Sequence, residues 1–263
     1  MPGRPYVLAE TTYLTVPSTD YEVAVLPWGA TEAHNFHLPY ATDNFEAEAV
    51  AIESARLAWQ RDARVVVLPT IPFGVNTQQL DIPLTINMNP STQVRVLQDI
   101  VKSLQGHSLR KLVVFNFHGG NNFRQMIRQA QAHTSLFLCA VDGHAAVPME
   151  EYFDQAGDHA NEMETSLIMH LAPELVRPLA EAGDGAAKRF RIPALREGWA
   201  WAPRQWTQVT SDTGVGDPSH STAEKGARYF KVVTEKVADF FVELAAAEPD
   251  DMYEGNQASR LKR

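Results

Sequence analysis

The sequence predicts an α/β fold in which helices cover both faces of a mainly parallel sheet. Short apolar, β-branched runs alternate four times with longer helical runs, and polar or glycine-containing turns follow the short runs. No linker rich in Gly, Ser or Pro divides the 263 residues. We therefore expect one domain over residues 1–263, with a core from about 20 to 247 and a polar tail at 248–263.

The first strand is expected at 22–26, where an apolar run has the length of a buried strand. A helix follows at 44–60, which is rich in Ala, Glu and Leu, and Asp43 is placed either to cap it or to bind a metal. Residues 64–68 are β-branched and predict the second strand. The segment 70–89 shows neither the helical nor the strand period, so we expect a long loop there. Loops of this length in compact domains are usually functional.

Pro90 is expected to open the next helix, because apolar residues between 94 and 104 recur on one face. The third strand is predicted at 111–115 and a helix at about 122–133. A fourth strand at 135–141 completes the alternation, which is typical of consecutive βαβ units.

The regular alternation of strands and helices ends after this strand. We expect irregular segments at 145–157 and 173–219, and helices at 159–171 and 222–244. Three tryptophans fall in the second irregular segment, at positions 199, 201 and 206. They could cover a pocket or bury a subunit contact.

Composition excludes several classes of protein. A net charge of −9 leaves no broad basic surface, so we expect no nucleic-acid partner. No segment approaches the ~20 apolar residues that span a bilayer, and the N-terminus lacks the apolar run of a secretion signal. The single cysteine, Cys139, lies in an apolar run, and we expect it to be a buried core residue. We expect a cytoplasmic protein with no membrane partner.

Two of the turns that follow strands carry side chains able to bind a metal. The first reads PWGATEAHNFHLPYATD and offers Glu32, His34, His37 and Asp43, and the second, NFHGGNN, offers His118. The carboxyl ends of parallel strands meet at one edge of a sheet, so we expect these side chains to lie together. Glu32 and His34 leave the same face of an extended chain and can converge on one ion.

Two imidazoles and two carboxylates suit Zn2+, Mn2+ or Fe2+ better than Ca2+. Because a carboxylate can use both oxygens, Asp43 could bridge two ions. The first turn taken alone is also consistent with a polar loop that happens to contain two histidines.

A third cluster, HANEMETS, holds His159, Glu162 and Glu164. Residues two apart on a helix point in different directions, so only one of the glutamates should serve a metal. His159 is expected at the helix start, where the helix dipole favours a neutral imidazole that can accept a proton. The alternative is a first turn that collects acids for the dipole.

These three blocks resemble the signature of the creatininase family. The first is similar to P-x-G-S/T-x-E-x-H-G-x-H-L-P-x-x-T-D, the second to N-G-H-G-G-N, and the third to H-A-G-E-x-E-T-S, and together they span roughly residues 22–176. The resemblance implies a three-layer α/β/α sandwich, a homohexamer, and a metal-dependent amidohydrolase of creatinine or related small amides and formamides. One branch of the family cleaves a modified peptide.

The resemblance also implies site residues. One ion is expected on Glu32, Asp43 and His118, and a second on His34 with Asp43, both being Zn2+ or Mn2+, with Fe2+ as an alternative. His159 resembles the catalytic histidine of the family.

Creatininase itself takes a further ligand from a glutamate where this chain has Gly120. We expect Glu164 to supply that ligand and to join His159 as a catalytic residue, with Glu162 as the alternative. In the long loop, Thr77 and Gln78 fall where the family contacts its substrate.

Two further departures concern the pocket. The first block has Asn35 where the family usually has glycine, and Tyr152 and Phe153 occupy the neighbourhood of tryptophans that enclose creatinine in creatininase. Creatinine itself is therefore a doubtful substrate. We expect hydrolysis of a non-peptide C–N bond in a small cyclic amide or formamide by a metal-activated hydroxide. The alternatives are a lactone or cyclic-ketone hydrolase, a non-catalytic relative and a peptide-processing relative.

Overall fold

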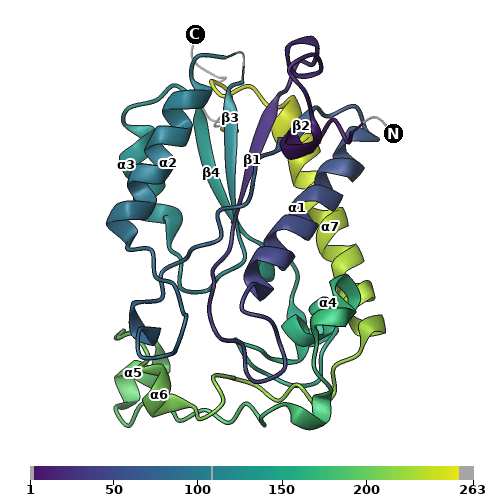
Figure 1. Cartoon of the computed structure of the whole chain (residues 1–263). Helices are drawn as coiled ribbons and strands as arrows, with labels where there is room; N and C mark the ends of the chain where they lie inside the picture. Colours follow the sequence, from purple (N-terminus) through teal and green to yellow (C-terminus); the bar gives the residue numbers. More distant parts are fainter. Residues whose placement is uncertain (1–2, 108, 255–263) are drawn as a thin grey trace, which may run out of the picture.

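Four parallel strands form a twisted sheet in the order β2-β1-β3-β4 (Figure 1). The computed structural model describes residues 3–107 and 109–254. The strands are β1 (Val23–Trp28), β2 (Val65–Val67), β3 (Lys111–Asn116) and β4 (Phe137–Asp142). Val25 pairs with Val67 on one side and Val113 on the other, and Val113 pairs with Cys139. The predicted parallel sheet is confirmed; part of the predicted polar tail, 255–263, lies outside the described residues.

Helices cover both faces of this sheet, which confirms the predicted three-layer arrangement (Figure 1). One layer contains α1 (Thr42–Trp59), α4 (Glu162–Leu171) and α7 (Ala223–Ala246), and the other contains α2 (Pro90–Leu104) and α3 (Phe123–Gln131). Short 3-10 turns lie at Leu8–Glu10, Val16–Ser18, Thr77–Gln79, Gly143–Ala145, Met149–Glu151, Pro173–Leu175 and Leu179–Glu181.

The alternation of side chains along the strands explains why the sheet needs both layers. Val23 and Val25 pack with α1 and α7, whereas Ala24, Leu26 and Trp28 pack with α2 and α3. Every residue of β1 is buried, as expected for a central parallel strand. Burial on both faces holds the carboxyl end of β1 in place, and the first polar turn begins there.

The second half of the chain departs from the prediction in two places. The segment 173–219 is not wholly irregular, because it contains the short helices α5 (Pro193–Glu197) and α6 (Trp206–Val209). Helix α4 begins at Glu162 and not at His159, because Asn161 caps it by accepting a hydrogen bond from the Glu164 amide at 3.0 Å. Helices α5 and α6 lie at the end of the molecule toward which the carboxyl ends of the strands point (Figure 1).

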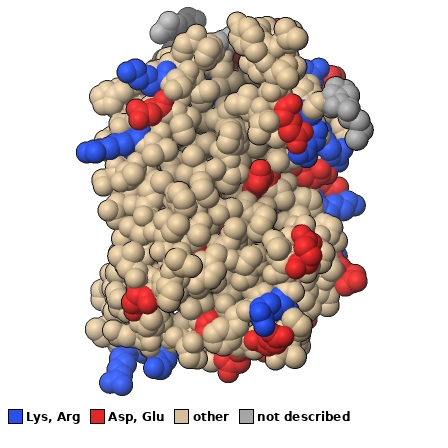
Figure 2. Space-filling view, viewed as in Figure 1, with Lys and Arg blue, Asp and Glu red and all other residues tan. Residues whose placement is uncertain are grey.

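On the face shown in Figure 2, basic and acidic side chains lie mostly near the margins and alternate in sign. This mixture accords with the chain's modest net charge of −9. Within the described ranges, no helix is both long enough and apolar enough to cross a membrane.

Candidate metal centre and its pocket

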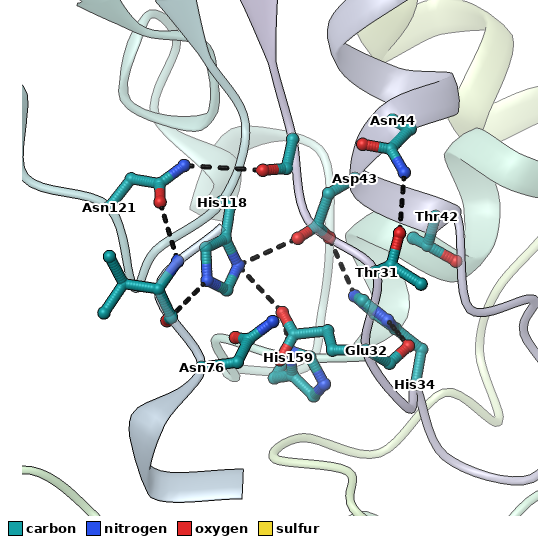
Figure 3. Close-up of polar contacts among 12 residues, drawn as sticks. Thr31, Glu32, His34, Thr42, Asp43, Asn44, Asn76, His118, Asn121 and His159 are labelled. Carbon is teal, nitrogen blue, oxygen red and sulfur yellow. Dashed lines mark hydrogen bonds and ion pairs between the residues drawn. The ribbon is translucent and has the colours of Figure 1, made fainter. Parts of the chain in front are cut away.

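Six side chains from separate segments converge at the carboxyl edge of the sheet. Figure 3 shows all of them except Glu164. Three come from the turn after β1 and the first turn of α1, one follows β3, and two come from α4 and the segment before it. They are Glu32, His34, Asp43, His118, His159 and Glu164, and all are at least 90% buried. The structure therefore brings together the five expected metal ligands and His159, and of the candidates in the first turn it leaves out His37.

Glu32, Asp43 and His118 form the first group, whose ligand atoms lie within 4.8 Å of one another. His118 Nδ1 is 2.8 Å from both Glu32 Oε1 and Asp43 Oδ2. Neither carboxylate oxygen has a partner with hydrogen-bond geometry among the described residues. Short nitrogen–oxygen distances without such geometry are what a shared cation between the atoms would produce.

His34, Asp43 and Glu164 form the second group with the same 4.8 Å limit. His34 Nε2 is 2.8 Å from Asp43 Oδ1, whereas His118 faces Asp43 Oδ2. Asp43 therefore belongs to both groups and presents one oxygen to each, the geometry of a bridging carboxylate. It does not cap α1, because Ala41 is the N-cap residue and Asp43 lies inside the first turn.

The outer ring nitrogens of the two histidines contact main-chain carbonyls, as the histidines of metal sites usually do. His118 Nε2 donates to the Val75 carbonyl at 3.1 Å, and His34 Nδ1 donates to the Glu32 carbonyl at 3.2 Å. A carbonyl only accepts, so each contact places the proton on the outer nitrogen and leaves the inner nitrogen free for a cation. With two imidazoles and three carboxylates, Asp43 among them, the donor set fits Zn2+ or Mn2+.

In the metal-free protein, protons take the place of such a cation. Burial alone would lower the pKa of His34, but the Asp43 carboxylate raises it to about 10. Burial is likewise outweighed at His118, whose pKa is raised well above its usual value by Glu32 and Asp43. Protons and divalent cations thus compete for the same nitrogens.

The two glutamates of α4 have separate environments. Glu162 accepts hydrogen bonds from the amides of Asp154 and Gln155 at 2.8 and 2.7 Å and pairs with Lys225. Glu164 faces the second group, and burial raises its pKa to about 7 against the opposing effect of His34. Glu164 thus belongs to a group that could hold a metal ion, whereas Glu162 pairs with Lys225 and lies outside these groups.

His159 lies beside the metal-binding groups, with its ring centroid 4.1 Å from that of His34. Its Nε2 donates to the Ala33 carbonyl at 2.8 Å, so Nδ1 is the nitrogen that can accept a proton; Nδ1 is 4.0 Å from Glu32 Oε1. Burial, followed by the nearby His34, lowers the pKa of His159 to about 4. The imidazole is neutral as predicted, but the predicted cause is wrong, because His159 precedes α4 and does not begin it.

His37, the remaining histidine of the first turn, does not join the cluster. Its Nε2 contacts Thr165 Oγ1 at 2.9 Å inside the protein. Asn35 has φ 54°, a left-handed conformation that explains why glycine is usual at this position of the signature.

A pocket of about 290 Å3 opens over the candidate centre. The predicted substrate residues Thr77 and Gln78 line it, as do Trp201 and Trp206. The expectation for Tyr152 and Phe153 is wrong. Both pack against Tyr229 of α7, with ring centroids 5.5 and 5.1 Å away, because the segment before α4 turns into the core. The Trp206 ring takes the place beside His159, at 4.6 Å.

Gln79 and Asn121 support the centre, and the sequence did not single out either as a support. The Gln79 amide donates to Glu32 Oε2 and orients that carboxylate. Asn121 accepts from the Val75 amide at 3.1 Å and donates to Asn116 Oδ1 at 2.9 Å, which joins the long loop to the turn after β3. The only signal was their position within polar loops, and loop residues have no periodicity that would mark a contact.

Gly120 cannot carry a side chain in this arrangement. A Cβ there would overlap His118 Nε2 and the Val75 carbonyl oxygen, the two atoms whose contact orients His118. Close packing around Gly120 therefore leaves no room for the glutamate that creatininase has at this position. Glu164 of α4 brings a carboxylate to the cluster instead.

The parallel α/β fold and the buried carboxylate–histidine cluster define a protein of the metal-dependent hydrolase type. The sequence profile of the creatininase family, described as creatinine amidohydrolase, matches residues 9–241, and the chain belongs to this family. Membership and the cluster together support a metal-dependent amidohydrolase.

Individual relatives differ in the activities for which they are named. The mycofactocin precursor peptide peptidase of Mycobacterium ulcerans is 31% identical over 232 residues, 85% of each chain. The creatinine amidohydrolase of Pseudomonas putida is 27% identical over 177 residues, 59% of this chain and 66% of that protein.

Solved structures agree in fold. A Bacteroides fragilis protein provisionally named a creatinine amidohydrolase is 44% identical, with a TM-score of 0.89 over 95% of this chain and 99% of that one. A manganese form of creatininase, 20% identical, has a TM-score of 0.77 over 93% of this chain and 100% of its own. The last comparison bears on the fold alone.

Proposed function

We propose that this protein is a two-metal amidohydrolase that cleaves the C–N bond of a small cyclic amide or formamide. The observation that carries the proposal is the pair of groups sharing Asp43, with the free Nδ1 of His159 beside them under one pocket. Glu32, Asp43 and His118 would hold one ion, and His34, Asp43 and Glu164 the other. Bound divalent cations supply Lewis acidity toward a carbonyl oxygen and a water of lowered pKa.

Side chains of the protein itself supply proton transfer and orient the reacting groups. His159, neutral at pH 7, accepts a proton at Nδ1 from the attacking water and returns it to the leaving nitrogen. The Ala33 carbonyl keeps the ring in the required tautomer. Gln79 holds Glu32 in place, and Trp206 packs against the His159 ring.

A second candidate substrate class is an amide bond within a peptide. The mycobacterial relatives named as peptide peptidases align over more of this chain, 85% for Mycobacterium ulcerans, than the creatinine amidohydrolase of Pseudomonas putida, at 59%. The same catalytic groups serve both classes, because each presents a carbonyl carbon bonded to nitrogen. The homohexamer and the cytoplasmic location stay predictions.

Metal analysis combined with a substrate screen tests this proposal. We expect two divalent ions per chain, and hydrolysis in a panel of cyclic amides, formamides, lactones and short peptides that is lost on chelation and restored by Zn2+ or Mn2+. His159→Asn should keep both ions and lower kcat by about 10² to 10⁴, whereas Asp43→Ala and His118→Ala should lose metal and activity together. Full turnover after complete chelation, or no hydrolysis of any compound by the loaded protein, would refute the proposal.

A further inference from the structure

The outer half of the pocket carries an arginine that the hydrolytic reaction does not need. Arg204, Asp158, Trp201 and Trp206 all line the pocket that leads to the candidate centre. Arg204 is the only lysine or arginine among the described residues that line it. The inner end of the pocket is built from carboxylates and histidines, so the single cationic side chain stands apart from the reacting groups.

The Arg204 guanidinium is held in place on two sides. Its Nη1 donates to both oxygens of Asp158, at 2.9 and 3.0 Å, and its central carbon lies 4.9 Å from the centroid of the Trp206 ring. Trp206 is itself buried and contacts His159 at 4.6 Å. The Trp206 ring therefore lies between the Arg204 guanidinium and the proposed base, His159. A small molecule can span the distance between these two groups.

The Arg204 guanidinium keeps hydrogen-bond donors that its contacts with Asp158 do not use. A guanidinium has five N–H donors in a fixed fork, and the contacts with Asp158 use one nitrogen. The Asp158 and Arg204 side chains are 59% and 35% exposed, so their ion pair is weak and an incoming anion can share the guanidinium. The indole N–H of Trp206 is buried and has no acceptor among the described residues.

We infer that Arg204 is a specificity-determining residue that binds a carboxylate on the substrate. This inference rests on the proposed function and narrows it to amides that carry a free carboxylate a few bonds from the scissile carbonyl. A planar carboxylate matches the fork of an arginine, and Trp206 keeps the fork oriented toward the pocket. Neutral amides of the same shape would leave the guanidinium without this partner.

Matched pairs of compounds test the inference. N-formylglycine is compared with N-formylglycinamide, and 5-oxoproline with 5-oxoprolinamide, because each pair differs only in the carboxylate. For the metal-loaded protein we measure kcat/KM where hydrolysis occurs and, for all four compounds, Kd by calorimetry. We expect the acid of each pair to be favoured by about tenfold, through KM or Kd and not through kcat.

Variants assign the preference to Arg204. Arg204→Ala should bring the acid and the amide to parity, and Arg204→Lys should keep part of the preference. Arg189→Ala removes an exposed arginine outside the pocket and should match the unaltered protein. Equal handling of acid and amide by the unaltered protein, or a preference that survives in Arg204→Ala, would overturn the inference.

The two proposals fail separately. Arg204-dependent binding of the acids without hydrolysis of any compound would retain the carboxylate site and reject the amidohydrolase. Hydrolysis of acids and amides at equal rates would retain the amidohydrolase and reject the role of Arg204.

Discussion

Exchanging each glutamate of α4 for glutamine tests whether Glu164 is the metal ligand and Glu162 a structural residue. Glu162 and Glu164 are both buried and lie two positions apart, yet their partners differ. Glu164→Gln removes a negative charge from the group with His34 and Asp43. Glu162→Gln leaves that group intact and removes the charge paired with Lys225. Each variant is thus the control for the other.

The metal-free protein should become more stable when Glu164 is replaced. In the folded chain the pKa of Glu164 is raised from 4.5 to about 7. Between these pH values the Glu164 carboxyl therefore binds more protons in the folded chain than in the unfolded chain. Stability then falls as pH rises from 4.5 to 7. At 1.36 kcal/mol per pKa unit the loss at pH 8 is on the order of 3 kcal/mol. Glutamine, which mimics the protonated acid, should recover most of it.

Replacement of Glu162 should act in the opposite direction. The variant loses a buried charge that accepts two amide hydrogen bonds and faces Lys225. The neutral amide can still accept from the main chain, but among the described residues the Lys225 ammonium keeps only Asp154 as an ionic partner, at 2.8 Å. We expect a loss of about 3 kcal/mol in the free energy of unfolding, with metal content unchanged.

Urea unfolding of chelator-treated protein at pH 5 and pH 8, combined with metal quantification, measures both effects. Glu164→Gln should weaken the binding of one ion by at least about 100-fold, since loss of even a residue that only hydrogen-bonds to a metal ligand costs about 10 to 100-fold. The reasoning is refuted if Glu164→Gln retains two ions at unchanged affinity, or if Glu162→Gln loses metal while Glu164→Gln does not.

Three further changes test single contacts. Gly120→Ala should weaken metal binding at least about tenfold by displacing His118, whereas Gly119→Ala, which has open space around the added carbon, should not; equal affinities would contradict this. Burial raises the pKa of the Cys139 thiol to about 12, so alkylation by iodoacetamide at pH 8, followed by mass spectrometry, should be about 10³-fold slower in the native protein than in urea. Lys111→Met should cost about 1 to 3 kcal/mol in urea unfolding, because Lys111 donates to the Leu244 and Ala245 carbonyls at the end of α7, and the exposed Lys236→Met is its control.

The sequence predicted the sheet well because its signals are local. Both β1 and β3 contain continuous apolar runs, and the polar turns directly after them carry Glu32 and His118. Parallel strands must end at a common edge, so the meeting of these side chains followed from topology. The ionisable cluster was predictable for the same reason.

The walls of the pocket were not predictable in this way. Trp206 lies 47 positions after His159, in a segment without regular period, and its contact with that ring depends on how the long connection folds back. Tyr152 is close to His159 in sequence but turns into the core against Tyr229. Proximity along the chain is a poor guide where a segment has no helical or strand register.

The charges of the cluster explain why folding and metal binding should be coupled in this protein. Glu32, Asp43 and Glu164 bring three carboxylates into one buried space, and no lysine or arginine of the described chain lines the inner pocket to balance them. His34 and His118 can balance two of the three only by holding protons, which their raised pKa values permit. Burial of the remaining charge is unfavourable, and it raises the pKa of Glu164. A divalent cation removes this cost and displaces the protons, so occupancy of the centre should determine much of the stability of the surrounding fold.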